Sequence, residues 1–319
     1  YPVRAIIRHQ KNASFQLAKV KAVDLAQKRL DTNAGSIYYD HLVFAAGGVT
    51  NFFGLESLKQ NAFILKDLDE AKDIRNHLLK MFELASTEKD ETRRRALLTF
   101  IIAGGGPTGV ESAGALSELT RLVLAKDYPD LDPHEIHILL LEAADHLLPA
   151  MPPDLSDFTL KVLNRKKIDV RFGAIVESFN GRQVVLKNGQ VLPAGTLIWA
   201  AGVQANPLAV SLAQPVGSLG RVRVQPTLQL DSHPEVFVIG DAAYLEDSKG
   251  QPLPMVAPVA MQQGECAAAN ILRSFHNQPP VPFEYHDPGT LATIGRNQAV
   301  AKIGRLKFRG FIAWVVWLG

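Results

Sequence analysis

The fold is decided by one stretch, Leu98-Thr99-Phe100-Ile101-Ile102-Ala103-Gly104-Gly105-Gly106-Pro107-Thr108-Gly109-Val110-Glu111. Its apolar first half predicts a buried β-strand, and a helical pattern follows the glycines. Gly104, Gly106 and Gly109 have the spacing G-x-G-x-x-G. Between a strand and a helix, this spacing allows a tight turn, the approach of a pyrophosphate to the backbone, and close helix packing. A glycine-rich turn is often only a turn, but this context predicts a dinucleotide site.

The composition is that of an ordinary α/β protein with room for two domains. The chain has 319 residues, of which 47% are hydrophobic and 21% charged, and a net charge of +2 that gives no case for nucleic-acid binding. The run Arg93-Arg94-Arg95 is interpreted as part of a solvated connector. Cys266 is the single cysteine, which excludes an internal disulfide and fits a reducing compartment.

The two ends of the sequence suggest a fragment. The chain opens at Tyr1 without a signal peptide, and it stops at Gly319 inside an apolar run. No run reaches the roughly 20 apolar residues of a membrane span. We therefore expect a protein that is incomplete at both ends.

A second strand is predicted over 135–142 and closes with Glu142. In dinucleotide-binding units an acidic residue at this place hydrogen-bonds the adenosine ribose hydroxyls. A surface glutamate that ends a strand is the alternative. Ala143 and Ala144 follow, and no arginine nearby can receive a 2′-phosphate, which favours NADH over NADPH. His134 and His137 have no cysteine near them, so no metal site is expected.

The remaining pattern predicts further strands and helices of an α/β fold. We expect short strands over 15–44 and a helix over 66–85, which a charged linker at 87–95 joins to the strand before the glycines. After the second strand we expect a helix over 155–165, a strand at 168–172, and a hairpin at 183–192 that turns on Asn-Gly. His77 is placed on the polar side of its helix and given no role. Strands that open into small residues occur twice, at 44–48 and 199–203, which suggests two related halves.

A further strand ends at Asp241. Val236-Phe237-Val238-Ile239 is apolar, Gly240 makes a turn, and Asp241 is presented at the carboxyl end of the strand. Ligands of open α/β sheets bind outside the carboxyl ends of strands. A contact with a polyol is favoured, and the cap of a following helix is the alternative. Cys266 lies in the predicted helix over 260–275, where packing is its expected role.

The last segment, 303–318, mixes basic and aromatic residues. Arg305, Lys307 and Arg309 accompany Phe308, Trp314 and Trp317. This mixture suits a surface that lies in a membrane interface. A strand or helix of the core is the alternative.

Several motifs occur in order along the chain: Ala45-Ala46-Gly47, Asn51-Phe52-Phe53-Gly54, Gly104 to Glu111, Ala200-Ala201-Gly202-Val203, Val238-Ile239-Gly240-Asp241, Val259 to Gly264, Ile294-Gly295-Arg296 and Gly310 to Trp317. Together they resemble a known family, the type II NADH dehydrogenases. These are single-subunit, non-proton-pumping NADH:quinone oxidoreductases among the two-dinucleotide-domain flavoproteins.

The resemblance implies FAD as the prosthetic group and NADH as the electron donor. Asp241 would bind the flavin ribitol and Glu111 would act at the nicotinamide–flavin contact, as the predicted catalytic residue. The other implied cofactor contacts are Ala46, Gly47, Gly104, Gly106, Pro107, Thr108, Gly109, Glu142, Ala201 and Gly202.

The resemblance also implies a quinone site at the start of the helix near 260. The residues that match the family motif or extend it are Ala257, Ala260, Gln262 and Gln263. Pro258 stands where the family has its first glutamine. The family's first glycine-rich loop, which holds the FAD pyrophosphate, is expected before residue 1 and does not occur in this sequence.

The expected protein has two Rossmann-like domains. Residues 1–64 and 226–282 form an incomplete FAD-binding domain, 65–225 an NADH-binding domain, and 283–319 the start of a membrane-associated region. The expected function is hydride transfer from NADH to FAD and electron transfer to a quinone, at the cytoplasmic face of a membrane, with a homodimer among the expected assemblies. The alternatives are a related flavoprotein reductase with another acceptor and a bare NAD(H)-binding module.

Overall fold

The computed structural model describes residues 3–318, without the side chains of 122–125. Tyr1 and Gly319, which belong to the expectation of a fragment, lie outside this range. The described chain forms two compact units, which we call unit 1 (up to residue 49, and 203–286) and unit 2 (50–202, and from 287 onward). These divisions differ from the predicted domain boundaries at 64, 225 and 282, and the FAD-binding and NADH-binding domains stay predictions.

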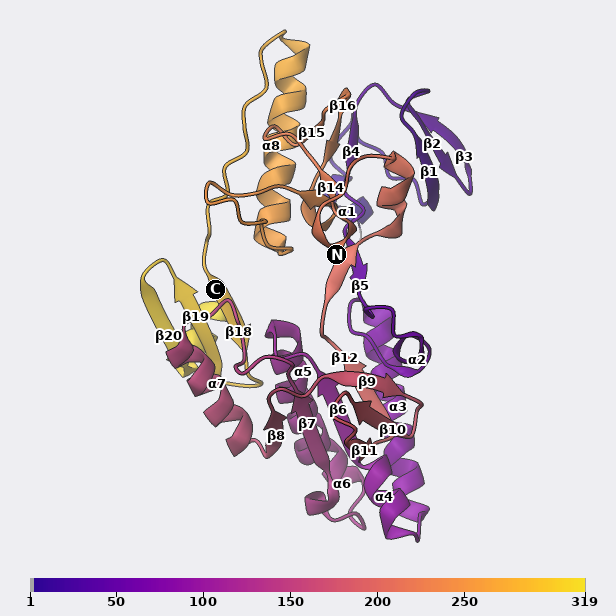
Figure 1. The fold of residues 1–319 in the computed structure, drawn as a ribbon, viewed down its shortest axis with the longest axis vertical. Coiled ribbons are helices and arrows are strands. Elements are labelled where there is room, and N and C mark those ends of the chain that lie inside the picture. The colour runs from indigo at the N-terminus through magenta and orange to yellow at the C-terminus, as the bar shows by residue number, and fades with distance from the viewer. Residues whose placement is uncertain (1–2, 319) are drawn as a thin grey trace. The chain divides into compact units, whose positions relative to one another are not determined.

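A parallel sheet of four strands forms the centre of unit 2 (Figure 1). Its order is β12 (Thr196–Trp199), β6 (Thr99–Ala103), β7 (His137–Leu141) and β8 (Ile168–Arg171). Every residue of β6 is buried, because both faces of the sheet are covered. The predicted α/β class and its Rossmann-like sheet are thus confirmed.

The two faces of this sheet pack against different partners. Successive side chains of a strand point to opposite faces. Phe100 and Ile102 accordingly pack with the helices α3 (Leu68–Thr87), α5 (Pro107–Glu118) and α7 (Pro153–Arg165). The alternate residues of the sheet pack on an antiparallel sheet of β9 (Val176–Phe179), β10 (Gln183–Leu186) and β11 (Val191–Pro193).

The helix α3 begins and ends two residues later than the predicted span of 66–85. The side chain of Asp67 accepts hydrogen bonds from the backbone N–H groups of Asp69 and Glu70, and the side chain of Glu70 accepts one from the N–H of Asp67. The predicted charged linker at 87–95 is wrong in its second half. Residues Glu91–Leu97 form the helix α4, because Asp90 caps it by accepting from the N–H of Arg93 at 2.9 Å.

The C-terminal part of unit 2 is a small antiparallel sheet and a helix. Its strands are β18 (Thr290–Thr293), β19 (Ala299–Ile303) and β20 (Leu306–Gly310), and α9 (Phe311–Leu318) packs on them through Ala313. Lys307 pairs with Asp154 of α7 at 2.6 Å. Among residues 3–318, no helix has the length and apolarity needed to cross a membrane.

Shorter elements complete unit 2. They are α2 (Glu56–Asn61), a π-helical segment η1 (Leu119–Leu124), α6 (Ala125–Asp127) and the single turn η2 (Pro133–Glu135). The π-helical segment directly continues α5, and Asp132 caps η2 by accepting from the N–H of His134 at 2.8 Å.

Unit 1 is built around β16 (His233–Val238). This strand pairs in parallel with β4 (Leu42–Phe44) and antiparallel with β15 (Gln229–Leu230). The long helix α8 (Ala257–Phe275) contributes Ala267 to the core beside Phe237. The other elements are α1 (Val3–Ile7), β5 (Gly48–Thr50), β13 (Val203–Ala205), η3 (Pro207–Leu212), η4 (Ser218–Gly220), β14 (Val222–Arg223), η5 (Gly240–Ala242) and β17 (Ala243–Tyr244).

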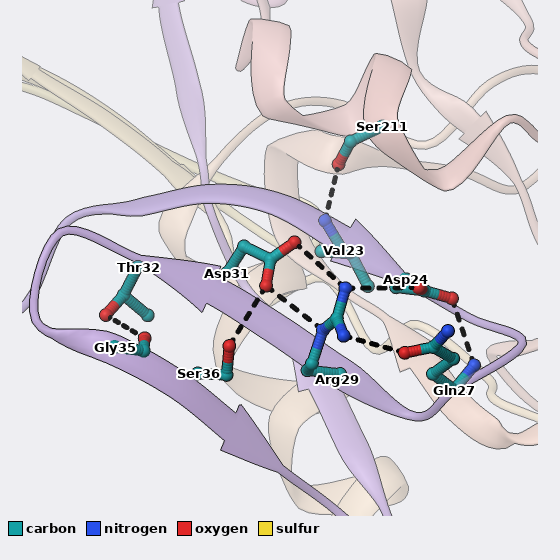
Figure 2. A network of polar contacts seen from close by, with 9 residues as sticks. All are labelled: Val23, Asp24, Gln27, Arg29, Asp31, Thr32, Gly35, Ser36 and Ser211. Carbon is teal, nitrogen blue, oxygen red and sulfur yellow. Dashed lines mark hydrogen bonds and ion pairs between the residues drawn. The ribbon is translucent and has the colours of Figure 1, made fainter.

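The predicted short strands over 15–44 form a three-stranded antiparallel sheet that precedes β4. Its members are β1 (Val20–Asp24), β2 (Arg29–Thr32) and β3 (Gly35–Tyr38), so residues 15–19 lie outside it. Figure 2 shows Arg29 between Asp24 and Asp31, whose carboxylates it pairs with at 3.5 and 3.1 Å. The hydroxyl of Ser211 accepts from the N–H of Val23 at 3.2 Å and ties this sheet to η3 (Figure 2).

Candidate functional site

Two of the three motif glycines are required by the backbone itself. Gly104 has a φ of +113°, and a Cβ there would lie 2.6 Å from the carbonyl oxygen of Ala200. A Cβ on Gly109 would overlap the carbonyl oxygen of Gly104. These contacts bring the end of β6, the start of α5 and the segment after β12 within backbone contact of one another. Larger side chains at either position would force the turn apart.

Gly106 is different, because nothing in the protein requires it. It is the N-cap of α5 with an extended backbone (φ −72°, ψ −177°), which any residue can adopt, and a Cβ there would meet no atom within 4 Å. The open space lies beside the first turn of α5, which holds Pro107 and Thr108, both exposed. The free N–H groups of such a turn attract an anion.

This open space belongs to a cavity of about 620 Å³, which we call the glycine cavity. It lies at the carboxyl ends of β6, β7 and β12, where ligands of open α/β sheets bind. Of the predicted site residues, it brings together Gly104, Gly106, Glu142, Ala201 and Gly202. Its volume falls within the range typical of small-molecule and cofactor sites.

The carboxylate of Glu142 is hydrogen-bonded to the backbone of the loop, independently of any ligand. One carboxylate oxygen accepts from the N–H of Gly105 at 2.5 Å, and the other accepts from the N–H of Ala144 at 2.7 Å. The side chain is half-buried and lines the glycine cavity. Since each carboxylate oxygen can accept a second bond, the group still has capacity for two ligand hydroxyls.

Two further residues line the glycine cavity and were not among the predicted site residues. Lys187 reaches the cavity from the hairpin that follows β9. Phe53 stands at the cavity with 58% of its surface exposed and a φ of +51°, and its ring lies edge-on to Trp199. The side chain of Asn51 holds this turn by accepting from the N–H of Phe53 at 2.8 Å. Both places follow from tertiary structure, for Phe53 from the contact with Trp199 of β12.

Glu111 lies in the second turn of α5, outside the lining of the glycine cavity. One of its carboxylate oxygens accepts from the backbone N–H of Thr293 in β18 at 3.1 Å. The half-buried side chain therefore connects α5 to the C-terminal sheet of unit 2. The structure leaves its predicted catalytic role a prediction.

In unit 1, the turn after β4 and the turn after β16 lie against each other. A Cβ on Gly48 would lie 3.0 Å from a carboxylate oxygen of Asp241. Gly47 has a φ of +67° with open space where a Cβ would be, and the carbonyl oxygen of Ala46 lies 3.4 Å from the side-chain amide nitrogen of Asn206. Among the described residues, none donates a hydrogen bond to the half-buried carboxylate of Asp241. It is thus an acceptor available to a polyol.

The predicted quinone residues begin α8, and two of them are bound to the backbone. The side-chain oxygen of Gln263, which is 1% exposed, accepts from the N–H of Gly240 at 2.6 Å. Gln262 exchanges two hydrogen bonds with the backbone of His286, at 2.8 and 3.0 Å. Ala260 packs on Gly240, and Ala257 is exposed in the first turn. Pro258 sits in that turn without cost, because its missing N–H would have no helical partner.

His77 is a second correction to the sequence analysis. It lies half-buried, rather than on the polar side of α3, with Nε2 within 2.9 Å of the hydroxyl of Thr196 and 3.2 Å of the carbonyl oxygen of Gly195. Burial lowers the pKa of its imidazole, the Gly195 carbonyl opposes that shift, and Lys80 adds to it. His77 therefore holds the start of β12 to α3.

The chain is similar to proteins of one family along nearly its whole length. Residues 4–264 match the profile of the pyridine nucleotide-disulphide oxidoreductases. A type II NADH:quinone oxidoreductase of Mycobacterium tuberculosis is 35% identical over 99% of this chain and 71% of its own length. One from Staphylococcus aureus is 31% identical over 95% of this chain and 75% of its own length.

The fold is also similar to solved structures. The structure of NDH2 from Plasmodium falciparum in complex with NADH superposes with a TM-score of 0.87. It is 20% identical in sequence, and the match covers 98% of this chain and 82% of that one. At this identity the match supports the fold, which is the one predicted here.

Proposed function

This chain belongs to the type II NADH:quinone oxidoreductases, flavin-dependent members of the pyridine nucleotide-disulphide oxidoreductase family, and we propose that its glycine cavity is the site for NADH. One observation carries the proposal. Gly106, a glycine that the protein itself does not need, opens into the same cavity as the partly free carboxylate of Glu142. A dinucleotide needs both a place for its pyrophosphate and an acceptor for its ribose.

Each part of NADH has residues suited to it. The pyrophosphate lies against Gly106 and the first turn of α5, where N–H groups and the helix dipole favour negative charge. The adenosine ribose donates its hydroxyls to Glu142. The nicotinamide follows Ala201 and Gly202, small residues that let a flat ring pass close to the backbone. Phe53 lines the same cavity and offers its exposed ring as an apolar contact for the dinucleotide.

FAD is the cofactor of the family, and residues of unit 1 fit its polyol and ring. Asp241 offers an acceptor that no described residue uses, and the turn at Gly47 leaves open space where a side chain would stand. We propose that Asp241 holds the ribitol, with Ala46 and Gly47 beside the ring. When bound, FAD would supply the acceptor for the hydride of NADH and the donor of two electrons to a quinone, and these residues would supply orientation and charge.

The quinone end of the reaction is proposed at the start of α8. Ala257 and Met261 are exposed there, and Gln262 and Gln263 fix the helix to the chain around it. A flat apolar ring would find an apolar surface on the first turns. A quinone needs two protons along with two electrons, so this end must also admit solvent protons.

We propose that the protein binds to a membrane surface through α9. Phe311, Ile312 and Trp317 are more than half exposed, and Val315 is nearly so. Aromatic and branched side chains on one short helix suit the interface of a bilayer. The cytoplasmic face and a homodimer remain further parts of this proposal, tested by topology-specific proteolysis and by sedimentation of the purified protein.

The experiment is a half-reaction assay with the flavin-loaded protein under anaerobic conditions. Adding NADH should bleach the flavin absorbance, and adding a short-chain quinone should restore it in equal amount. A loaded protein that NADH bleaches and quinone leaves bleached would support a reductase with another acceptor. A protein that binds NADH without any flavin band would support a bare nucleotide-binding module.

The sequence does not support a redox disulfide of this chain as the acceptor of the electrons. Such an acceptor works through a pair of redox thiols, and Cys266 is the only cysteine in the sequence. Burial also raises the pKa of its thiol, which disfavours the reactive thiolate.

A further inference from the structure

Unit 2 has a second cavity at the opposite end of its sheet. Its volume is about 720 Å³, and it lies at the amino ends of β6, β7 and β8, bordered by α4 and η2. We call it the amino-end cavity. From Thr99 at this end to Ala103 at the other, β6 spans about 13 Å at the usual rise of a strand. A ligand here would therefore occupy a place separate from the glycine cavity.

Three cations from three elements line the amino-end cavity without a carboxylate partner. They are Arg95 of α4, Arg121 of η1 and Lys167, which precedes β8. Among the described residues, none of the three forms an ion pair. Asp169 also lines the cavity, but Arg171 pairs with it through two hydrogen bonds of 2.8 and 2.9 Å. Glu91 is then the one remaining acid in the lining, against three free cations.

Arg121 is held in place although no acid neutralises it. Its two terminal nitrogens donate to the carbonyl oxygens of Pro133 and Ile136, at 3.2 and 3.0 Å. Its Nε is buried and finds no hydrogen-bond partner among the described residues. Burial lowers the pKa of this guanidinium, since a charge away from water is costly without a counter-charge.

The positive potential of the cavity also reaches His137. Burial lowers the pKa of this imidazole first, and the charges of Arg95 and then Arg121 lower it further, while Glu135 opposes them. The charges of both arginines therefore reach the same residue, His137, at the start of β7. A cavity of this kind attracts an anion.

We propose that the amino-end cavity binds a small phosphorylated molecule with an apolar or aromatic body, of the chemical type of a nucleoside diphosphate. The cations come from separate elements, so they suit a ligand with more than one anionic oxygen group. Ala96, which is half-buried, and Pro193, which is exposed, supply an apolar surface for the body of the ligand. This site is independent of the proposed function, because it shares no lining residue with the glycine cavity.

Calorimetric titration with ADP tests the proposal, using the flavin-loaded protein with saturating NAD⁺ to fill the dinucleotide site. We expect saturable binding. Replacing Arg95→Gln or Lys167→Gln should weaken ADP by about five-fold each, the range of partly exposed charge contacts, and about 25-fold together. Arg121 is left intact because its bonds to Pro133 and Ile136 support the fold.

The matched control is Lys161→Gln, an exposed lysine of α7 outside both cavities, which should leave ADP affinity unchanged. Hydrogen exchange should show ADP protecting amides of 91–99 and 133–139. Three results would overturn the proposal: no saturable binding, equal affinity in the double variant, or protection at 104–111 in place of these segments. Pyrophosphate should bind more weakly than ADP, and equal binding would refute the apolar part of the site.

Discussion

Gly106→Ala should separate ligand binding from folding. The added methyl would meet no protein atom within 4 Å, and the backbone there is one that alanine adopts freely. Replacing glycine by alanine at an N-cap lowers the free energy of unfolding by about 0.5–1 kcal/mol. Because alanine also gives the unfolded chain less conformational freedom, the same change raises the free energy of unfolding by about 0.4–1 kcal/mol. The free energy of unfolding should therefore change by less than about 0.5 kcal/mol.

The methyl would instead occupy the place of the pyrophosphate. It would remove one hydrogen bond or weaken two to a charged oxygen, which together are worth about 2 kcal/mol, so NADH should bind about 30-fold more weakly. Urea unfolding measures the first quantity, and titration calorimetry with NADH measures the second. The reasoning is refuted if affinity for NADH is that of the unaltered protein, or if stability falls by more than about 2 kcal/mol.

Two other glycines are the controls for this prediction. Gly264→Ala adds a methyl inside α8 at an ordinary 3.8 Å from Ile239. It should stabilise the helix by about 1 kcal/mol and leave NADH affinity unchanged. Gly109→Ala, whose methyl would overlap the carbonyl oxygen of Gly104, should impair folding itself. The same chemical change should thus give three different outcomes.

Three further predictions follow from the same contacts. Glu142→Gln should weaken NADH about ten-fold, because its amide NH₂ would face an N–H group of the loop and offer one fewer acceptor; an unchanged Kd removes its role at the ribose. Phe53→Gly should relieve a positive φ worth about 1 kcal/mol and still raise the KM for NADH several-fold; a KM within two-fold of the parent removes the ring from the site. The buried His77 has a lowered pKa, so the folded state resists protonation and Tm should fall as pH drops below about 6.5. His77→Gln should flatten that slope, and an identical slope in a thermal melt series contradicts the assignment.

The glycine loop could be predicted from the sequence because its determinants are local. A strand, three spaced glycines and a helix occupy one continuous stretch, and the steric need for Gly104 and Gly109 arises within it or beside it. The partner of Glu142 could not be found this way. Its bond to the N–H of Gly105 joins residues 37 positions apart, and only the parallel pairing of β6 and β7 brings them together.

Helical periodicity alone did not predict how a distant segment covers His77. The sequence analysis placed it on the polar side of α3, but its Nε2 lies within hydrogen-bond distance of Gly195 and of Thr196 in β12, 118 and 119 positions away, and the side chain is half-buried. The quinone-site residues show the same limit. Gln263, beside the family motif, was predicted as a quinone residue, and its side-chain oxygen also accepts from the N–H of Gly240, a contact that the motif does not reveal. A polar residue next to a glycine turn is as suited to hold that turn as to meet a ligand.

The run Arg93-Arg94-Arg95 shows why a cluster of like charges in sequence is not a patch on the surface. Once Asp90 starts α4, successive side chains diverge by about 100° around the helix. Arg94 then pairs with Glu135 at 2.6 Å, Arg93 lines a separate cavity near His77, and Arg95 reaches the amino-end cavity. A flexible linker would let all three cations face water, whereas the helix fixes one of them beside Arg121, where no described acid pairs with it. The anion site proposed for that cavity therefore depends on α4 being helical, and Asp90→Ala, which removes the cap, should weaken ADP there while leaving NADH binding at the far end of β6 intact.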